Sequence, residues 1–202
     1  MRLLVFGAGG HARSVIDAAR TAGWEIAGVI GRPGDPDAVL GHPVTHDASG
    51  VEADGFVVAV GDNGRRRAAF EEHRARGLVP VTVVHPSAIL GGNVEVGAGS
   101  FLAAGVVVNV NAGIGENAIL NTGCSVDHDC VVGAHTLVGP GANLCGETVL
   151  GEGVLLGAGA SVVPGASVGE WSVVGAGAAV TGDLPPRCVC AGVPARVLRL
   201  VE

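Results

Sequence analysis

The chain has 202 residues, a formal net charge of −7, 35 glycines and only 3% aromatic residues. The acidic balance excludes a typical nucleic-acid-binding surface. No apolar stretch reaches membrane-spanning length without glycine, so membrane insertion is not expected either. The few aromatic residues favour a glycine-rich solenoid with an aliphatic interior over a core of large side chains between helices.

The N-terminal region begins with a strand–helix–strand pattern. Residues 2–6 form a strand-like apolar run rather than a signal peptide, and the five cysteines lack a disulfide framework, so we expect a reduced, cytoplasmic protein. The segment 7–12, Gly-Ala-Gly-Gly-His-Ala, precedes a helix expected to run through Ala22, with Gly23 as its stop. Residues 25–30 form the second strand. This glycine-rich turn places backbone amides where a phosphate can approach the helix N-terminus.

The same turn matches the dinucleotide fingerprint, with Ala12 in its last place. An NAD site needs an acidic residue at the end of the second strand, where this chain has Gly31 and Arg32. Arg32 suits a 2′-phosphate, but the chain has no constellation for hydride transfer. The alternatives are therefore an oxidoreductase, a phosphate-binding turn of another enzyme, or glycines that only form a tight turn.

The rest of the N-terminal region is expected to be a loop, two strands and a helix. Residues 32–37 form the loop, 56–60 the third strand and 81–84 the fourth. Gly61 opens a turn into an arginine-rich helix that ends near Gly77. Its three consecutive arginines at 65–67 are interpreted as a solvated face rather than an anion site. We expect a Rossmann-like domain over residues 1–84, rigidly joined to a second domain that begins at residue 85.

A repeat of six residues occupies the chain from Leu90 to Val180. Every sixth residue is aliphatic, and the residue two before it is no larger than valine from Ser100 onward. The third residue after each aliphatic is usually Gly or Asn, which tolerate the left-handed backbone of a corner. This pattern resembles a left-handed parallel β-helix of hexapeptide repeats, about five coils long here, with residues eighteen apart stacked on one another. It is expected over residues 85–183, followed by a tail over 184–202.

The clearest break in the repeat is Asp127-His128-Asp129, which puts an imidazole between two carboxylates just before a corner. Carboxylate neighbours raise the basicity of histidine, which suits a general base near neutral pH. The alternative is a surface histidine beside solvated aspartates. A zinc site is not expected, because the repeat from Leu90 to Val180 has only His128 and His135, at adjacent corners. Covalent catalysis is disfavoured, because Cys124 and Cys130 belong to the inward lane.

Taken together, these segments resemble the sialic-acid O-acetyltransferase-like family of hexapeptide-repeat sugar acyltransferases, which includes N-acetyltransferases of nucleotide-linked 4-amino sugars. The resemblance covers essentially the whole chain. It is carried by the glycine-rich turn at 7–12, Ala59-Val-Gly-Asp-Asn63, Val84-His-Pro-Ser87, Asp127-His-Asp-Cys130 within the repeat, and Gly192-Val-Pro-Ala-Arg196.

The resemblance implies direct acetyl transfer from acetyl-CoA to a sugar acceptor, without a metal, in a homotrimer with sites between subunits. His128 corresponds to the general base, Asp129 to the acid that supports it, and Gly146 to the residue whose amide binds the thioester carbonyl. The residues matching coenzyme A contacts are Leu137, Gly146, Ala158 and Ala176. Gly9, Gly10 and His11 match contacts to the nucleotide sugar, and the further candidates for acceptor binding are Gly31, Arg32 and Gly61.

Two departures from the family leave the acceptor open. Many members have a second histidine nine residues after the base, where this chain has Leu137. Members that use UDP-sugars have an aspartate pair that recognises uracil, at the places of Gly31 and Arg32. We expect acetylation of the amine of a nucleotide-linked amino sugar. The alternatives are sugar O-acetylation, as in the sialic-acid type, and a non-catalytic scaffold that binds nucleotide sugars.

Overall fold

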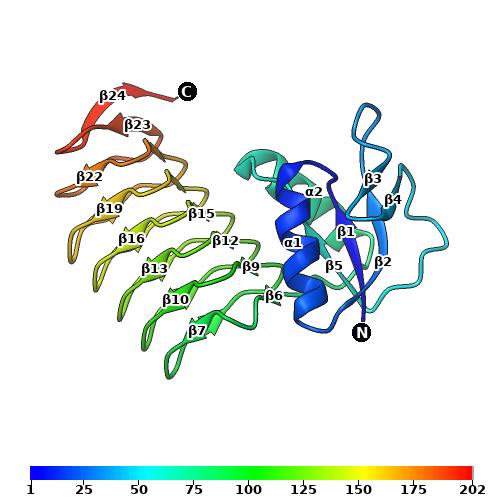
Figure 1. The fold of residues 1–202 in the computed structure, drawn as a ribbon. Coiled ribbons are helices and arrows are strands. Elements are labelled where there is room, and N and C mark those ends of the chain that lie inside the picture. The colour runs from blue at the N-terminus through cyan, green and yellow to red at the C-terminus, as the bar shows by residue number, and fades with distance from the viewer. Residues whose placement is uncertain (202) are drawn as a thin grey trace.

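A computed structural model describes residues 1–201, and they form an α/β region beside a β-solenoid (Figure 1). The α/β region contains a five-stranded sheet in the order β3-β4-β2-β1-β5. β1 lies between β2 and β5 and is parallel to both, as in half of a Rossmann fold. Its elements are β1 (Arg2–Phe6), α1 (Gly10–Thr21), β2 (Glu25–Ile30), β3 (Ala38–Val39), β4 (His42–Thr45), β5 (Gly55–Val58) and α2 (Asn63–Ala75).

Most of the predicted elements of this region are confirmed, with differences at their ends. β5 ends at Val58, short of the predicted strand over 56–60. The hairpin of β3 and β4 was not predicted. Its two turn residues, Leu40 and Gly41, both have positive φ, a geometry usually signalled by Asn-Gly rather than Leu-Gly. The predicted strand over 81–84 is confined to β6 (Val83–Val84), which pairs with the solenoid rather than with the α/β sheet.

The solenoid consists of two-residue strands that stack in parallel, and from β6 to β22 paired residues lie eighteen positions apart, as Val107 pairs with Ser125. The strands belong to three sheets, so each coil has three sides and three corners. The antiparallel strands β23 (Cys188–Ala191) and β24 (Arg196–Leu200) close the last coil. The repeating strands are β7 (Ile89–Leu90), β8 (Glu95–Val96), β9 (Phe101–Leu102), β10 (Val107–Val108), β11 (Gly113–Ile114), β12 (Ile119–Leu120), β13 (Ser125–Val126), β14 (Val131–Val132), β15 (Leu137–Val138), β16 (Asn143–Leu144), β17 (Val149–Leu150), β18 (Leu155–Leu156), β19 (Ser161–Val162), β20 (Ser167–Val168), β21 (Val173–Val174) and β22 (Ala179–Val180).

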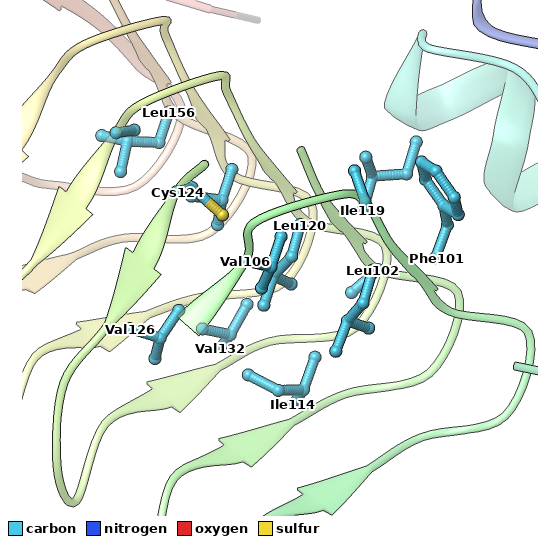
Figure 2. Packing of buried hydrophobic residues seen from close by; sticks show 14 of the residues in the cluster. Phe101, Leu102, Val106, Ile114, Ile119, Leu120, Cys124, Val126, Val132 and Leu156 are labelled. Atoms are coloured by element: carbon cyan, nitrogen blue, oxygen red, sulfur yellow. The ribbon is translucent and has the colours of Figure 1, made fainter. Parts of the chain in front are cut away.

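The predicted inward lanes form the interior of the solenoid. Figure 2 shows Leu102, Leu120 and Cys124 directed into the coils, and both Cys124 and Cys130 are fully buried. The exceptions are Leu90, which is 41% exposed, and Val96, which is partly buried, because both lie in the first coil, at the end of the stack. The interior is mostly aliphatic, so its burial supplies hydrophobic stabilisation to this half of the chain. Among residues 1–201, no helix is long and apolar enough to cross a membrane.

Every corner of the repeat from position 93 to position 177 has a residue in the left-handed conformation. Most are Gly or Asn, as predicted, but Asp129, His135, Glu147 and Trp171 also adopt positive φ. We name the three columns of corners by what lies at them. The His128 corner comprises 92–93, 110–111, 128–129, 146–147 and 164–165; the α2-facing corner comprises 98–99, 116–117, 134–135, 152–153 and 170–171; the third corner comprises 104–105, 122–123, 140–141, 158–159 and 176–177.

A buried arginine joins the α/β region to the solenoid. Arg66, in α2, is only 1% exposed. Its Nε donates to the carbonyl of Asn117 at 3.0 Å, and its Nη2 donates to the carbonyl of His135 at 2.7 Å. On the other side, Nη1 donates to the carbonyls of Val60 and Gly61. The interpretation of residues 65–67 as a solvated face is therefore wrong for Arg66, whose donors satisfy carbonyls on both parts of the chain.

Replacing Arg66 with Met is expected to lower the free energy of unfolding by about 3 kcal/mol, because the buried carbonyls around it lose their donors. Burial lowers the pKa of Arg66 to about 10, so the guanidinium stays charged at neutral pH. Equilibrium unfolding in urea measures the effect. Arg67→Met is the matched control on the same helix, since Arg67 is 42% exposed and pairs with Glu71 at the surface. Equal destabilisation by both substitutions would contradict this account of Arg66.

Candidate active site

The imidazole of His128 lies at the end of β13, on the corner named after it. Its Nδ1 is 2.9 Å from Oδ2 of Asp129. Because a carboxylate only accepts, Nδ1 carries the hydrogen and Nε2 keeps its lone pair. The backbone N–H of His128 donates to Oδ1 of Asp127 at 2.8 Å, which fixes the main chain just before the ring. The tautomer is the one that a general base needs.

The charges around this imidazole favour its protonated form. The hydrogen bond to Asp129 is the main cause that raises the pKa of His128, and the carboxylates of Asp127, Asp129 and Glu147 add to it. The same hydrogen bond lowers the pKa of Asp129, so the acid stays ionised. His128 and Asp129 are both about half exposed, at 49% of their side-chain surface, so solvent and substrates can reach the ring.

Gly146 lies one coil further, directly against the ring. A Cβ built on Gly146 would lie 2.5 Å from both Cε1 and Nε2 of His128. Glycine is therefore the residue that lets the ring occupy this position. The predicted stacking of His128 and Gly146, eighteen residues apart, is confirmed by the contact and by the hydrogen bond from the N–H of Glu147 to the carbonyl of His128 at 2.9 Å.

The amides around Gly146 show which donors remain available. The N–H of Cys145 donates to Val162 and that of Glu147 to His128, as the coil ladder requires. The N–H of Gly146 donates to no acceptor among residues 1–201. Gly146 is buried with the imidazole on its Cβ side, so an oxygen that accepts this N–H lies beside the ring. A free donor next to a base is the arrangement that stabilises an oxyanion during acyl transfer.

A second site is a cavity of about 420 Å³ in the α/β region. It contains the N-terminus of α1, whose first turn has no acidic residue and no side-chain cap, so the free amides and the helix dipole favour an anion. The candidate residues predicted for acceptor binding all line this cavity: Gly9, Gly10, His11, Gly31, Arg32 and Gly61.

The glycines that line the cavity fall into two classes. A Cβ at Gly9, Gly10 or Gly61 would meet no atom within 4 Å among the described residues, so packing does not demand glycine there and the backbone is open to a ligand. Gly31 is different, because a Cβ there would lie 2.5 Å from Val44 in β4. Any larger residue at this place would therefore require Val44 to move.

Two histidines beside the cavity have lowered pKa values. Burial, followed by the charge of Arg66, lowers the pKa of His11 to about 4. Its Nε2 is buried without a hydrogen-bond partner among residues 1–201. The ring of His73 stacks on Phe6 with centroids 3.5 Å apart, and burial lowers its pKa. The sequence pattern of the arginine-rich helix did not single out His73.

The predicted residues fall into three groups that one chain does not bring together. His128, Asp129 and Gly146 meet at the His128 corner. Ala158 and Ala176 lie on the third corner, stacked so that a Cβ on Gly157 would be 2.5 Å from the N of Ala176, and Leu137 lies in β15 on the sheet before that corner. The cavity adjoins α2, on the other side of the coils from the end of β13 (Figure 1).

Comparison with known proteins gives matches along the whole chain. Residues 2–73 match the PglD N-terminal domain, and residues 147–182 match the bacterial transferase hexapeptide (six repeats). No curated protein sequence matched the chain.

Solved structures match more extensively. PerB from Caulobacter crescentus, solved with CoA and GDP-perosamine, is 38% identical, with 98% of this chain and 97% of that chain covered and a TM-score of 0.91. The acetyltransferase domain of PglB from Neisseria gonorrhoeae, solved with acetyl coenzyme A, is 32% identical, with 98% of each chain covered and a TM-score of 0.89. WeeI from Acinetobacter baumannii is 25% identical, covers 98% and 100%, and has a TM-score of 0.90. This chain therefore belongs to the sialic-acid O-acetyltransferase-like family of hexapeptide-repeat sugar acyltransferases.

Proposed function

We propose that the protein transfers an acetyl group from acetyl-CoA to the amine of a nucleotide-linked amino sugar. The proposal rests on one observation. Nε2 of His128 lies against Gly146, and neither this nitrogen nor the backbone N–H of Gly146 has a hydrogen-bond partner among residues 1–201. The relatives support the two substrates, since PerB was solved with CoA and GDP-perosamine and the PglB domain with acetyl coenzyme A. An amine acceptor agrees with the description of PerB as a perosamine N-acetyltransferase.

The proposed reaction is a direct transfer. The acceptor nitrogen attacks the thioester carbonyl while Nε2 of His128 takes a proton from that nitrogen. The carbonyl oxygen becomes an oxyanion, which the amide of Gly146 stabilises by about 3 kcal/mol. The intermediate then collapses, the carbon–sulfur bond breaks, and the thiolate of CoA leaves with the proton from His128. Asp129 stabilises the imidazolium that exists between these two proton transfers.

The acceptor is proposed to bind in the cavity of the α/β region, with its phosphates at the N-terminus of α1 and against Gly9, Gly10, His11 and Gly61. Gly31 and Arg32 replace the uracil-binding aspartates, which favours a GDP-linked rather than a UDP-linked sugar. The bound ligand of PerB supports the same choice.

We also propose a homotrimer with sites between subunits. In one chain the cavity is lined only by residues of the α/β region, while His128 lies at another corner of the solenoid. A second copy that brings its third corner beside His128 would place Leu137, Ala158 and Ala176 along acetyl-CoA. Free rather than paired cysteines agree with the cytoplasmic location proposed from the sequence.

The test is release of free thiol from acetyl-CoA with GDP-, UDP- and dTDP-linked 4-amino sugars as acceptors. We expect turnover with the GDP-linked amine and little with the others. Mass spectrometry of the product should show one added acetyl group on the nitrogen. The proposal fails if acetyl-CoA binds but none of these amines is acetylated, and turnover with free sialic acid would indicate O-acetylation instead.

The rate should depend on pH through His128, which acts only when neutral. Because carboxylates raise its pKa, kcat/KM should rise with pH through an inflection above the ordinary value of about 6.5. Asp129→Asn removes the main cause, so the proton leaves at lower pH and the inflection moves down. The same acceptor is used for both enzymes, so the titration of its amine cancels. Coincident inflections in the two profiles would contradict the role of Asp129.

A further inference from the structure

The His128 corner carries a ladder of side-chain hydrogen bonds that ends on the carboxylate of Asp129. Asn93, Asn111 and Asp129 occupy the same corner in three successive coils, each with positive φ. Nδ2 of Asn93 donates to Oδ1 of Asn111 at 3.1 Å, and Nδ2 of Asn111 donates to Oδ1 of Asp129 at 3.0 Å. The two oxygens of Asp129 therefore have different partners, Asn111 on Oδ1 and His128 on Oδ2.

A second rung supports the residue on the other side of the imidazole. Nδ2 of Asn109 donates to Oδ1 of Asp127 at 2.8 Å, and the same oxygen accepts the backbone N–H of His128. Thus each carboxylate that flanks His128 is held by an amide from the coil below it. The two rungs differ in their effect, because Asp127 holds the main chain and Asp129 holds the ring.

The side chain of Asp129 needs such a restraint. It is half exposed, and its carboxylate accepts side-chain hydrogen bonds from Asn111 and His128. Without Asn111, the bond to His128 is the one side-chain hydrogen bond among residues 1–201 that keeps the carboxylate from turning toward water. Oriented carboxylates fix the tautomer and the direction of a histidine only while they are themselves held. The charged groups that face the ring are Asp127, Asp129 and Glu147. Of these three, Asn111 forms a hydrogen bond with Asp129 alone.

On these contacts, and resting on the proposed role of His128 as the base, we propose that Asn111 is a positioning residue for acetyl transfer. Its amide holds Asp129 in the rotamer that accepts the N–H of Nδ1, and so keeps Nε2 as the free base beside Gly146. The side chain of Asn111 bonds to Asn93 and Asp129 rather than to the imidazole, so it acts through Asp129.

The corner itself supplies a clean substitution. Glycine occupies eight of the fifteen left-handed corner positions from 93 to 177, so Asn111→Gly removes the amide without backbone strain. Asn93→Gly is the matched control, because Asn93 has the same backbone conformation and loses one rung of the same ladder, yet touches neither Asp129 nor His128. Asn111→Gly removes two rungs and Asn93→Gly one, so a purely structural ladder predicts a difference in stability between the variants but none in the tautomer of His128 or in kcat.

The first measurement is nitrogen-15 NMR of the imidazole of His128 in the protein without substrates. In Asn111→Gly we expect a mixture of the two neutral tautomers and a lower pKa, whereas Asn93→Gly keeps the Nδ1-protonated tautomer of the wild type. The second is thiol release, in which Asn111→Gly should lower kcat roughly tenfold with little change in KM for acetyl-CoA, the size typical when a partner that orients a histidine is lost.

Identical spectra and rates for the two variants would overturn the proposal and leave the ladder a structural feature. The NMR measurement does not depend on catalysis, so it tests the positioning by Asn111 even if His128 proves not to be the base. If Asn111→Gly shifts the tautomer of His128 but keeps full activity, Asn111 does position Asp129, and its proposed role in acetyl transfer is wrong.

Discussion

His128→Asn is expected to lower kcat for acetyl transfer by about 10³-fold, within the range that general-base catalysis supplies. Asn is close in size to the proximal part of the ring and can still hydrogen-bond Asp129, but it has no basic nitrogen at the place of Nε2. Thiol release with the acceptor amine at saturating acetyl-CoA measures the loss. The thermal midpoint should hardly move, because His128 is half exposed.

His42→Asn is the control for this substitution. His42 lies in β4 and does not line the cavity, so its replacement should leave kcat unchanged. Binding of acetyl-CoA to His128→Asn, measured by calorimetry, separates loss of the base from loss of the cofactor site. Near-wild-type turnover of His128→Asn with intact binding would remove His128 from the mechanism.

Gly146→Ala is expected to reduce kcat by about a hundredfold or more while leaving the fold intact. The new methyl group would lie 2.5 Å from Cε1 and Nε2 of His128, and the ring can relieve this contact only by swinging away from the coil. Because the ring is the outer end of an exposed side chain, stability should change little. Catalysis should fall, because the backbone N–H stays in place while the displaced base is no longer beside it, and general-base catalysis typically contributes about 10²–10⁴-fold.

Gly92→Ala is the matched control, since Gly92 has the equivalent place on the same corner and a Cβ there meets nothing within 4 Å among the described residues. It should retain wild-type kcat and stability. The decisive measurement is the ratio of the kcat values of the two variants, with unfolding in urea measured in parallel. If Gly146→Ala is as active as Gly92→Ala, the imidazole does not work in the position that it occupies against Gly146.

The solenoid could be predicted from the sequence because its spacing is strict. An uninterrupted period of six fixes which residues face inward, and three hexads per coil put Gly146 over His128 by counting alone. The ladder of Asn93, Asn111 and Asp129 was open to the same arithmetic, since its members are also eighteen residues apart. It was missed because corner asparagines were explained by backbone conformation alone.

Features of the α/β region were harder to predict because they depend on distant partners. The three arginines at 65–67 look alike in sequence, and only the carbonyls of Asn117 and His135, far along the chain, make Arg66 a buried residue. The β3–β4 hairpin has a Leu-Gly turn without the usual signal. The stacking of His73 on Phe6 likewise joins a helix to a strand that no local pattern connects.

The eighteen-residue register also restricts how the length of this enzyme can change during evolution. Loss of one hexad between His128 and Gly146 would shift every later residue to another corner, so the loop after β16 would no longer bring a glycine over His128. Loss of eighteen residues would shorten the stack by one coil and leave each remaining column intact. Viable insertions and deletions in the solenoid should therefore come in whole coils, or as loops that bulge from a corner without disturbing the ladder.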